Sequence, residues 1–231
     1  MTDEKGAPSP WAQAVLALAL VGALGVGLLY LGQQDKSRQD DAARQPAACD
    51  HGDREEEVPA GHVSGTKLCD ALNRADLAQL LGTPVEKPKS AYGSSHSSKK
   101  GDGRKVDTSQ ARVEFDTYTV TVEASYDRVP VSALAPLLGT ESTVHRFLGH
   151  PAFTYADRTI SISFQPGKST GRTGSGVPAR TLAVALDPKD TGGSLTMSVW
   201  RSDGVAPEEA VLLGLAEKVL PSVPGFTRAA G

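Results

Sequence analysis

The sequence has few aromatic residues, only two cysteines and no large excess of charge of either sign. Aromatic side chains make up 5% of the 231 residues and apolar side chains 39%, so the core must be mostly aliphatic. The formal net charge is −3, and no part of the chain carries the basic face or stripe that nucleic-acid binding requires. We therefore expect no nucleic-acid partner.

Long hydrophobic runs are also absent, with one exception near the N-terminus. Residues 14–31 are 18 consecutive residues without a charge. As a helix they would cover about 27 Å, close to the hydrocarbon thickness of a bilayer. Trp11 and Tyr30 lie at its two ends, where aromatic rings favour the headgroup level. The pattern predicts a tail over residues 1–10 and a transmembrane helix over 11–32, with the lipid bilayer as a partner.

Whether the two cysteines are paired depends on which side of the membrane the domain lies. Cys49 and Cys69 are 20 positions apart. In an extracytoplasmic protein they would pair and stabilise the fold by about 3 kcal/mol, whereas in a reducing compartment they would remain free thiols. Basic residues after the hydrophobic run outnumber Lys5 before it, which mildly favours a cytoplasmic domain. We expect a single-pass protein of the cell membrane with an extracellular C-terminal domain and a Cys49–Cys69 disulfide.

Composition divides the rest of the chain into a linker and one domain. Residues 33–65 are charged, mostly acidic and without hydrophobic periodicity, which predicts a disordered acidic linker. Residues 66–231 are sufficient for one extracytoplasmic domain with a core of its own. Within it, residues 86–110 and 166–178 are rich in glycine, serine and basic residues and predict two mobile loops.

Hydrophobic periodicity predicts the fold of this domain. Apolar residues alternate over 113–126, with a change of phase at 116–117 that indicates a turn or a bulge. Five further segments alternate as antiparallel strands with one buried face do: 143–148, 152–156, 159–165, 180–187 and 193–201. Helices are expected over 73–82, over 130–138 and after Pro207. The predicted fold class is α+β: one N-terminal transmembrane helix, then a single domain with an antiparallel sheet of about six or seven strands packed by about three helices.

Motifs for catalysis or metal binding are weak. The string GKSTG at 167–171 matches the G-x-S-x-G pattern around a hydrolase nucleophile, Ser169 here, but it lies in a glycine-rich loop and not at a strand-to-helix turn. The five histidines lack metal-ligand spacing, and the sequence has no Cys-x-x-Cys. We expect no catalytic residue, no cofactor and no metal.

Polar residues at strand ends are weak candidates for a ligand site. Tyr126 and Arg128 follow one predicted strand, and Asp157 and Arg158 lie between two others. An Asp–Arg pair in such a place is either a surface ion pair of small energetic value or a ligand contact. Trp200, near another strand end, either covers the core or anchors a partner.

Several short motifs resemble those of an uncharacterised family of single-pass membrane proteins from actinobacteria, which carry a domain of unknown function. The motifs are GQQ at 32–34, SGTKLC at 64–69, ALN at 71–73, LLGTP at 80–84, SYDR at 125–128, LGHP at 148–151 and DRTI at 157–160. More distantly, the chain is similar to secreted actinobacterial lipoproteins with an α/β sandwich, although the lipid-bearing cysteine is missing. Neither resemblance implies a known activity or a catalytic residue.

The sequence therefore favours a membrane-anchored extracytoplasmic domain that acts as a non-catalytic binding or scaffolding module of the cell envelope. Its expected partner is an envelope protein or ligand of unknown identity. One alternative is an envelope-acting, hydrolase-like enzyme that uses Ser169 or the Asp157–Arg158 region. Such an enzyme should gather at least two of the candidate polar residues in one concave pocket. The other alternative is a membrane-tethered regulator that faces the cytoplasm.

Overall fold

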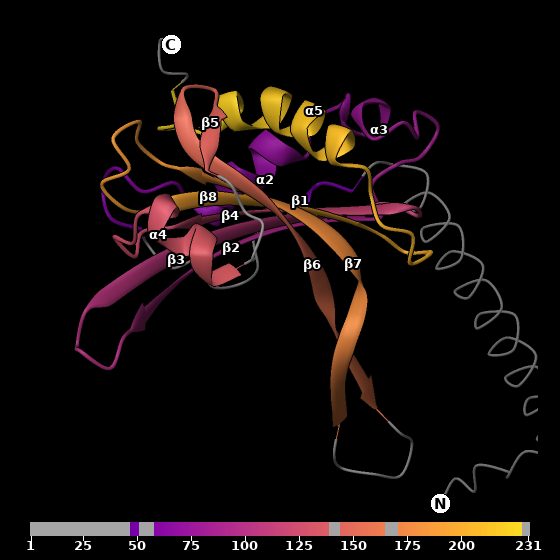
Figure 1. Cartoon of the computed structure of the whole chain (residues 1–231). Coiled ribbons are helices and arrows are strands. Elements are labelled where there is room, and N and C mark those ends of the chain that lie inside the picture. The colour runs from indigo at the N-terminus through magenta and orange to yellow at the C-terminus, as the bar shows by residue number, and fades with distance from the viewer. Residues whose placement is uncertain (1–46, 51–57, 139–143, 165–170, 228–231) are drawn as a thin grey trace, which may run out of the picture. The chain divides into compact units, whose positions relative to one another are not determined.

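The computed structural model describes residues 47–50, 58–138, 144–164 and 171–227, which belong to one compact unit spanning Pro46–Gly231. A sheet of eight strands forms the centre of this unit (Figure 1). Its strand order is β1-β2-β3-β4-β8-β7-β6-β5, with β1 and β2 parallel and the other neighbours antiparallel. The strands are β1 (Cys49–Asp50), β2 (Ser90–Lys99), β3 (Lys105–Glu114), β4 (Tyr118–Ser125), β5 (His145–Phe147), β6 (His150–Phe164), β7 (Gly171–Ala185) and β8 (Ser194–Arg201).

The fold is mostly β, so the predicted α+β class with six or seven strands is wrong. Both β2 and part of β3 occupy residues 86–110, which the composition predicts to be a mobile loop. The buried positions of β2 are Ala91, Gly93 and Ser95. These side chains are too small to produce the hydrophobic alternation by which a strand is recognised.

The domain also begins earlier than Thr66. Two parts of the predicted linker 33–65 belong to the fold. Strand β1 pairs with β2, and residues 58–65 lead into the first helix. The rest of that linker, the tail 1–10 and the predicted span 11–32 lie outside the described residues. Within the described part of the chain no helix is long and apolar enough to cross a membrane, so the transmembrane helix of the predicted fold class is not among its elements.

In the second half of the chain, the strands are longer than the sequence predicts. Strand β6 runs through two predicted segments, with a register irregularity between Arg158 and Ile160. Strand β7 begins at Gly171, inside the predicted loop 166–178, while residues 165–170 and the candidate Ser169 lie outside the described residues. The turn predicted at 116–117 is confirmed, because β3 ends at Glu114 and β4 begins at Tyr118.

Helices cover the two faces of the sheet unequally (Figure 1). One face packs against α2 (Gly65–Leu72), α3 (Leu77–Leu80), α5 (Glu209–Val219) and the short 3₁₀ helix η1 (Leu220–Ser222), and this layer holds the main core. Helix α4 (Val131–Leu138) packs on the opposite face, over Phe153, Ala183 and Ala185. The helix predicted after Pro207 is confirmed as α5. The sheet face beside α4 is left with mostly polar side chains.

Side-chain hydrogen bonds cap the N-termini of α2 and α4. The hydroxyl of Ser64 accepts a hydrogen bond from the Lys67 N–H at 3.4 Å and caps α2. At α4 the cap comes from a distant loop, because the Asp190 carboxylate accepts from the N–H groups of Val131 (2.7 Å) and Ser132 (2.9 Å). Such caps typically contribute about 1 kcal/mol each.

A disulfide between Cys49 and Cys69 confirms the predicted pairing. Cys49 lies on β1, a strand of two residues, and Cys69 is fully buried on α2. The bond therefore ties the short edge strand to the main helical layer.

Candidate functional site

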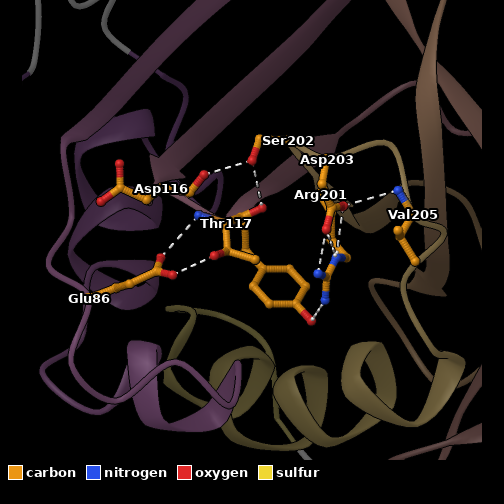
Figure 2. A network of polar contacts seen from close by, with 8 residues as sticks. Glu86, Asp116, Thr117, Arg201, Ser202, Asp203 and Val205 are labelled. Atoms are coloured by element: carbon orange, nitrogen blue, oxygen red, sulfur yellow. Dashed lines mark hydrogen bonds and ion pairs between the residues drawn. The ribbon is translucent and has the colours of Figure 1, made fainter.

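A polar network joins three loops at one end of the sheet (Figure 2). The Glu86 carboxylate accepts two hydrogen bonds from Thr117, one from the hydroxyl and one from the backbone N–H of that residue at 3.1 Å. After β8, the Ser202 hydroxyl donates to the carbonyl of Asp116 at 2.7 Å. These bonds hold the loop before β2, the β3–β4 turn and the loop after β8 against one another.

One ion pair of this network joins Arg201 and Asp203. Nitrogen atoms of Arg201 donate to the carboxylate of Asp203 at 2.6 and 3.0 Å, and this hydrogen bonding lowers the pKa of Asp203 to about 2. Arg201 also donates to the Tyr118 hydroxyl at 3.0 Å. A carboxyl with so low a pKa remains ionised near neutral pH, so the Arg201–Asp203 pair is maintained and helps to hold the loop after β8.

A hollow of about 430 Å³ lies beside Glu86, between the α2–α3 segment and the loop before β2. Its apolar lining includes Pro84, Pro88 and Phe115. Its most prominent cation, Arg74, is already paired with Asp76 and donates to the carbonyl of Lys218 at 2.6 Å. The hollow therefore offers an apolar wall with few free polar groups.

Tyr126, one of the predicted ligand contacts, has a structural role. Its ring stacks on His62 with centroids 3.6 Å apart, and its hydroxyl accepts a hydrogen bond from the Val63 N–H at 2.7 Å. Burial raises the pKa of this phenol. Tyr126 thus holds the segment that leads into α2.

The neighbouring Asp107 is a buried carboxylate with three polar neighbours. It accepts a hydrogen bond from the Ser97 hydroxyl, and it lies 3.2 Å from His62 Nδ1 and 3.5 Å from Lys105 Nζ. The Ser97 hydrogen bond, followed by the positive charge of Lys105, lowers the pKa of Asp107. Its ionised form is therefore favoured by the fold.

Asp107→Asn is expected to reduce the loss of stability on acidification. Because the folded-state pKa of Asp107 lies below its value in the unfolded chain, about 3.9, the carboxylate stabilises the fold above that pH. This contribution is lost as the pH falls through the folded-state pKa. Urea unfolding at about pH 5 and pH 3 measures the loss in the free energy of unfolding between the two pH values. Asp70→Asn, an exposed change on α2, is the matched control, and an equal acid loss in wild type and Asp107→Asn would contradict the assignment.

The predicted candidates Asp157 and Arg158 line a groove on the sheet face beside α4. This open-face groove has a volume of about 370 Å³. Its floor comes from β3, β4 and β8, and its wall from the β6–β7 hairpin, whose far end twists away from α5 (Figure 1). The lining residues are Arg112, Thr121, Asp157, Arg158, Thr159, Ile160, Ala179, Ser198 and Trp200.

Two features of the groove wall are typical of a surface that contacts a ligand. Ile160 is 79% exposed although it is large and apolar. Arg158 makes no ion pair among the described residues, and the Asp157 carboxylate accepts the Arg158 backbone N–H at 2.7 Å. The expected Asp157–Arg158 surface ion pair is therefore not formed, and the guanidinium is available.

The groove floor contains a contact that the sequence does not reveal. The Arg112 guanidinium lies 5.4 Å from the centre of the Trp200 ring and pairs with Glu114 at 3.0 Å. Arg112 and Trp200 are 88 positions apart, and only the register of β3, β4 and β8 brings them together. The sequence indicates only that Arg112 and Trp200 occupy strand positions that alternate with the buried ones.

The structure separates the four candidate residues into two places. Asp157 and Arg158 lie in the open-face groove, whereas Tyr126 and Arg128 line a different pocket at the start of β3. An enzyme is expected to gather at least two of the candidate polar residues in one pocket. The groove contains two of them, Asp157 and Arg158, but these are neighbours in the sequence. Two of its three hydroxyl groups are engaged in hydrogen bonds: Ser198 with Thr181 at 2.8 Å, and Thr159 with the Val177 backbone.

Across the described residues, no group of three or more His, Cys, Asp or Glu side chains is arranged to hold a metal ion. Burial raises the pKa of Glu123 on β4, but this carboxyl does not line the groove. The charged residues that line the groove are Arg112, Asp157 and Arg158.

The fold and these hollows define a disulfide-linked, mostly β domain with a preformed groove on an open sheet face. The chain belongs to a family of unknown function (DUF6215), whose model matches residues 5–141. No curated protein and no solved structure matches the chain. The matched region covers β1 to β4 and α4, while Asp157, Arg158 and Trp200 lie beyond it.

Proposed function

We propose that this chain is a non-catalytic binding or scaffolding module of the actinobacterial cell envelope, and that its ligand occupies the open-face groove. The observation that carries the proposal is that Arg158, which makes no ion pair among the described residues, lines one concave surface together with the exposed Ile160 and with Trp200. An aromatic ring, an aliphatic side chain and a free guanidinium together bind a ligand that has both apolar and anionic or polar parts.

The disulfide supports a location on the outer side of the cell membrane. Disulfides persist in oxidising compartments and are rare in the cytosol. A regulator that faces the cytoplasm would keep Cys49 and Cys69 as free thiols, so the bonded pair favours the extracytoplasmic alternative.

Ile160→Ser is expected to remove retention of an envelope component by the immobilised full chain. The side chain is exposed, so the fold tolerates the change, while the groove loses its apolar wall. The matched control is Val205→Ser, a second exposed β-branched residue outside the groove lining. Cell-envelope extract is passed over each variant, and retained material is compared.

A fluorescence measurement places the retained component at the groove. The chain has two tryptophans, so in a Trp11→Phe background the emission reports Trp200 alone. The retained component should change this emission in wild type and in Val205→Ser, and not in Ile160→Ser. Equal retention by wild type, Ile160→Ser and Val205→Ser would contradict the proposal, and so would the absence of any change in Trp200 emission.

A further inference from the structure

A second hollow, the Arg128 pocket, lies at the start of β3 and apart from the open-face groove. It has a volume of about 250 Å³ and shares no lining residue with the groove. Its lining is Arg104, Lys105, Val106, Tyr126, Asp127 and Arg128. Three of these six side chains are cations, and the Tyr126 ring and Val106 supply an apolar wall.

The Arg128 backbone is held in a conformation that arginine rarely adopts. Its φ is +61°, in the left-handed region that favours glycine and asparagine. Gly192 packs directly against it, since a Cβ at Gly192 would lie 2.4 Å from the Arg128 Cα. The Asp127 carboxylate accepts the Val129 N–H at 3.0 Å, and the Val129 carbonyl accepts from Gly193 at 3.2 Å. The surrounding chain therefore enforces the conformation.

The other positive-φ residues of the described chain, apart from glycines, have evident local reasons. Asp190 uses its carboxylate to cap α4, and Leu148 precedes Gly149 in the tight β5–β6 turn. Arg128 makes no side-chain hydrogen bond or ion pair among the described residues. An unusual backbone conformation maintained for an unpaired arginine points to a use for the side chain.

Charges around the pocket add an independent observation. Lys99 and Lys105 are direct cross-strand partners at the turn end of the β2–β3 hairpin, and like charges in that position repel. Five cations lie on the hairpin end and the pocket, against three carboxylates: Lys99, Lys100, Arg104, Lys105 and Arg128 against Asp102, Asp107 and Asp127. The Asp107 carboxylate, 3.5 Å from Lys105 Nζ, offsets only part of this positive charge. An anion in the pocket would offset more of it and would pair with Arg128.

We propose that the Arg128 pocket binds a phosphate group, held by the Arg128 guanidinium and the Lys105 ammonium, with any attached carbon chain against Tyr126 and Val106. Guanidinium groups match phosphate oxygens in pairs, and lysine adds a point charge. Such a group occurs both in free phosphate compounds and in lipid headgroups.

Arg128→Asn tests the proposal without a folding penalty. Asparagine tolerates the left-handed conformation better than arginine does, so the variant should unfold at the wild-type temperature or above. Inorganic phosphate is titrated into the ¹⁵N-labelled full chain at constant ionic strength, and the amide shifts of Lys105, Tyr126 and Arg128 are followed. We expect saturable shifts in wild type and at least a tenfold weaker affinity in Arg128→Asn.

Two further variants separate charge from position. Arg128→Lys keeps the charge and should retain part of the affinity, whereas Arg146→Asn removes an exposed arginine elsewhere, on β5, and should bind phosphate as wild type does. Non-saturable shifts, or an affinity that is the same in Arg128→Asn, would overturn the proposal.

Vesicle sedimentation distinguishes the two sources of phosphate. The full chain and Arg128→Asn are compared on phosphatidylcholine vesicles with and without phosphatidylglycerol. Extra binding to the anionic vesicles that Arg128→Asn lacks assigns the pocket to a lipid headgroup. Phosphate binding without that difference assigns it to a soluble phosphate compound, and failure of both arms refutes the site while leaving the groove proposal untouched.

Discussion

Replacing Cys49 and Cys69 together by alanine is expected to lower the midpoint of thermal unfolding by about 6–12 °C. The bond closes a loop of 20 residues, and such a loop constrains the unfolded chain by about 3 kcal/mol. For a domain of this size, each kcal/mol corresponds to about 2–4 °C. Alanine is preferred to serine because Cys69 is fully buried, and an unpaired hydroxyl there would add its own penalty.

The expected change is also local. Strand β1 has two residues and pairs with β2 only at Ala91 and Tyr92, so without the disulfide little holds it to the sheet. Thermal unfolding followed by circular dichroism, with and without reductant, measures the effect. Reduced wild type should match the double variant, and reductant should not shift the variant further. A midpoint within about 2 °C of oxidised wild type would contradict the role given to the bond.

Gly93→Ala is expected to destabilise the domain by about 3 kcal/mol, at the upper end of overpacking effects. A Cβ at this position would lie 2.2 Å from the Gly65 carbonyl oxygen and 3.0 Å from the Cβ of Cys69. The first of these contacts is with backbone, so no side-chain rotation relieves it. Helix α2 would have to move away from β2, and the Gly65 N–H would lose its 2.8 Å hydrogen bond to the Ser95 hydroxyl.

Gly214→Ala provides a control of opposite sign. Gly214 lies in α5, is exposed, and has no atom within 4 Å of an added Cβ. Alanine in an exposed helix position stabilises by about 0.8–1 kcal/mol relative to glycine. Urea unfolding of both variants gives the two values. A Gly93→Ala protein as stable as wild type would show that α2 does not rest on the β2 backbone.

The strands of the second half were predictable because their buried positions are large. Large apolar residues alternate at Leu182 and Val184 on β7, and at Leu195, Met197 and Val199 on β8, and this alternation marks the face that packs on the main core. On β2 the same face is built from Ala91, Gly93 and Ser95, since α2 approaches too closely for larger side chains. A close helix–strand contact thus removed the pattern from which the strand would have been recognised.

Helix α2 was missed for a related reason. Its signal is the Ser64 cap followed by a stretch of eight residues, short enough to be taken for the end of a linker.

The candidate site was predicted only in part. Asp157 and Arg158 were predicted as polar residues between two strands, but Arg112 was not predicted, because its relation to Trp200 depends on strand order. The left-handed backbone of Arg128 has no sequence signal at all.

The sheet order has a consequence for how the chain folds. Strand β4 lies at the middle of the sheet, yet one of its two neighbours is β8, with Tyr118 paired to Arg201. During synthesis, β4 therefore remains an aliphatic, unpaired edge until some 80 further residues have been made. Pairing over such a separation is slow. A chain cut at residue 141, where the family model ends, would keep that edge open permanently, which invites association between chains.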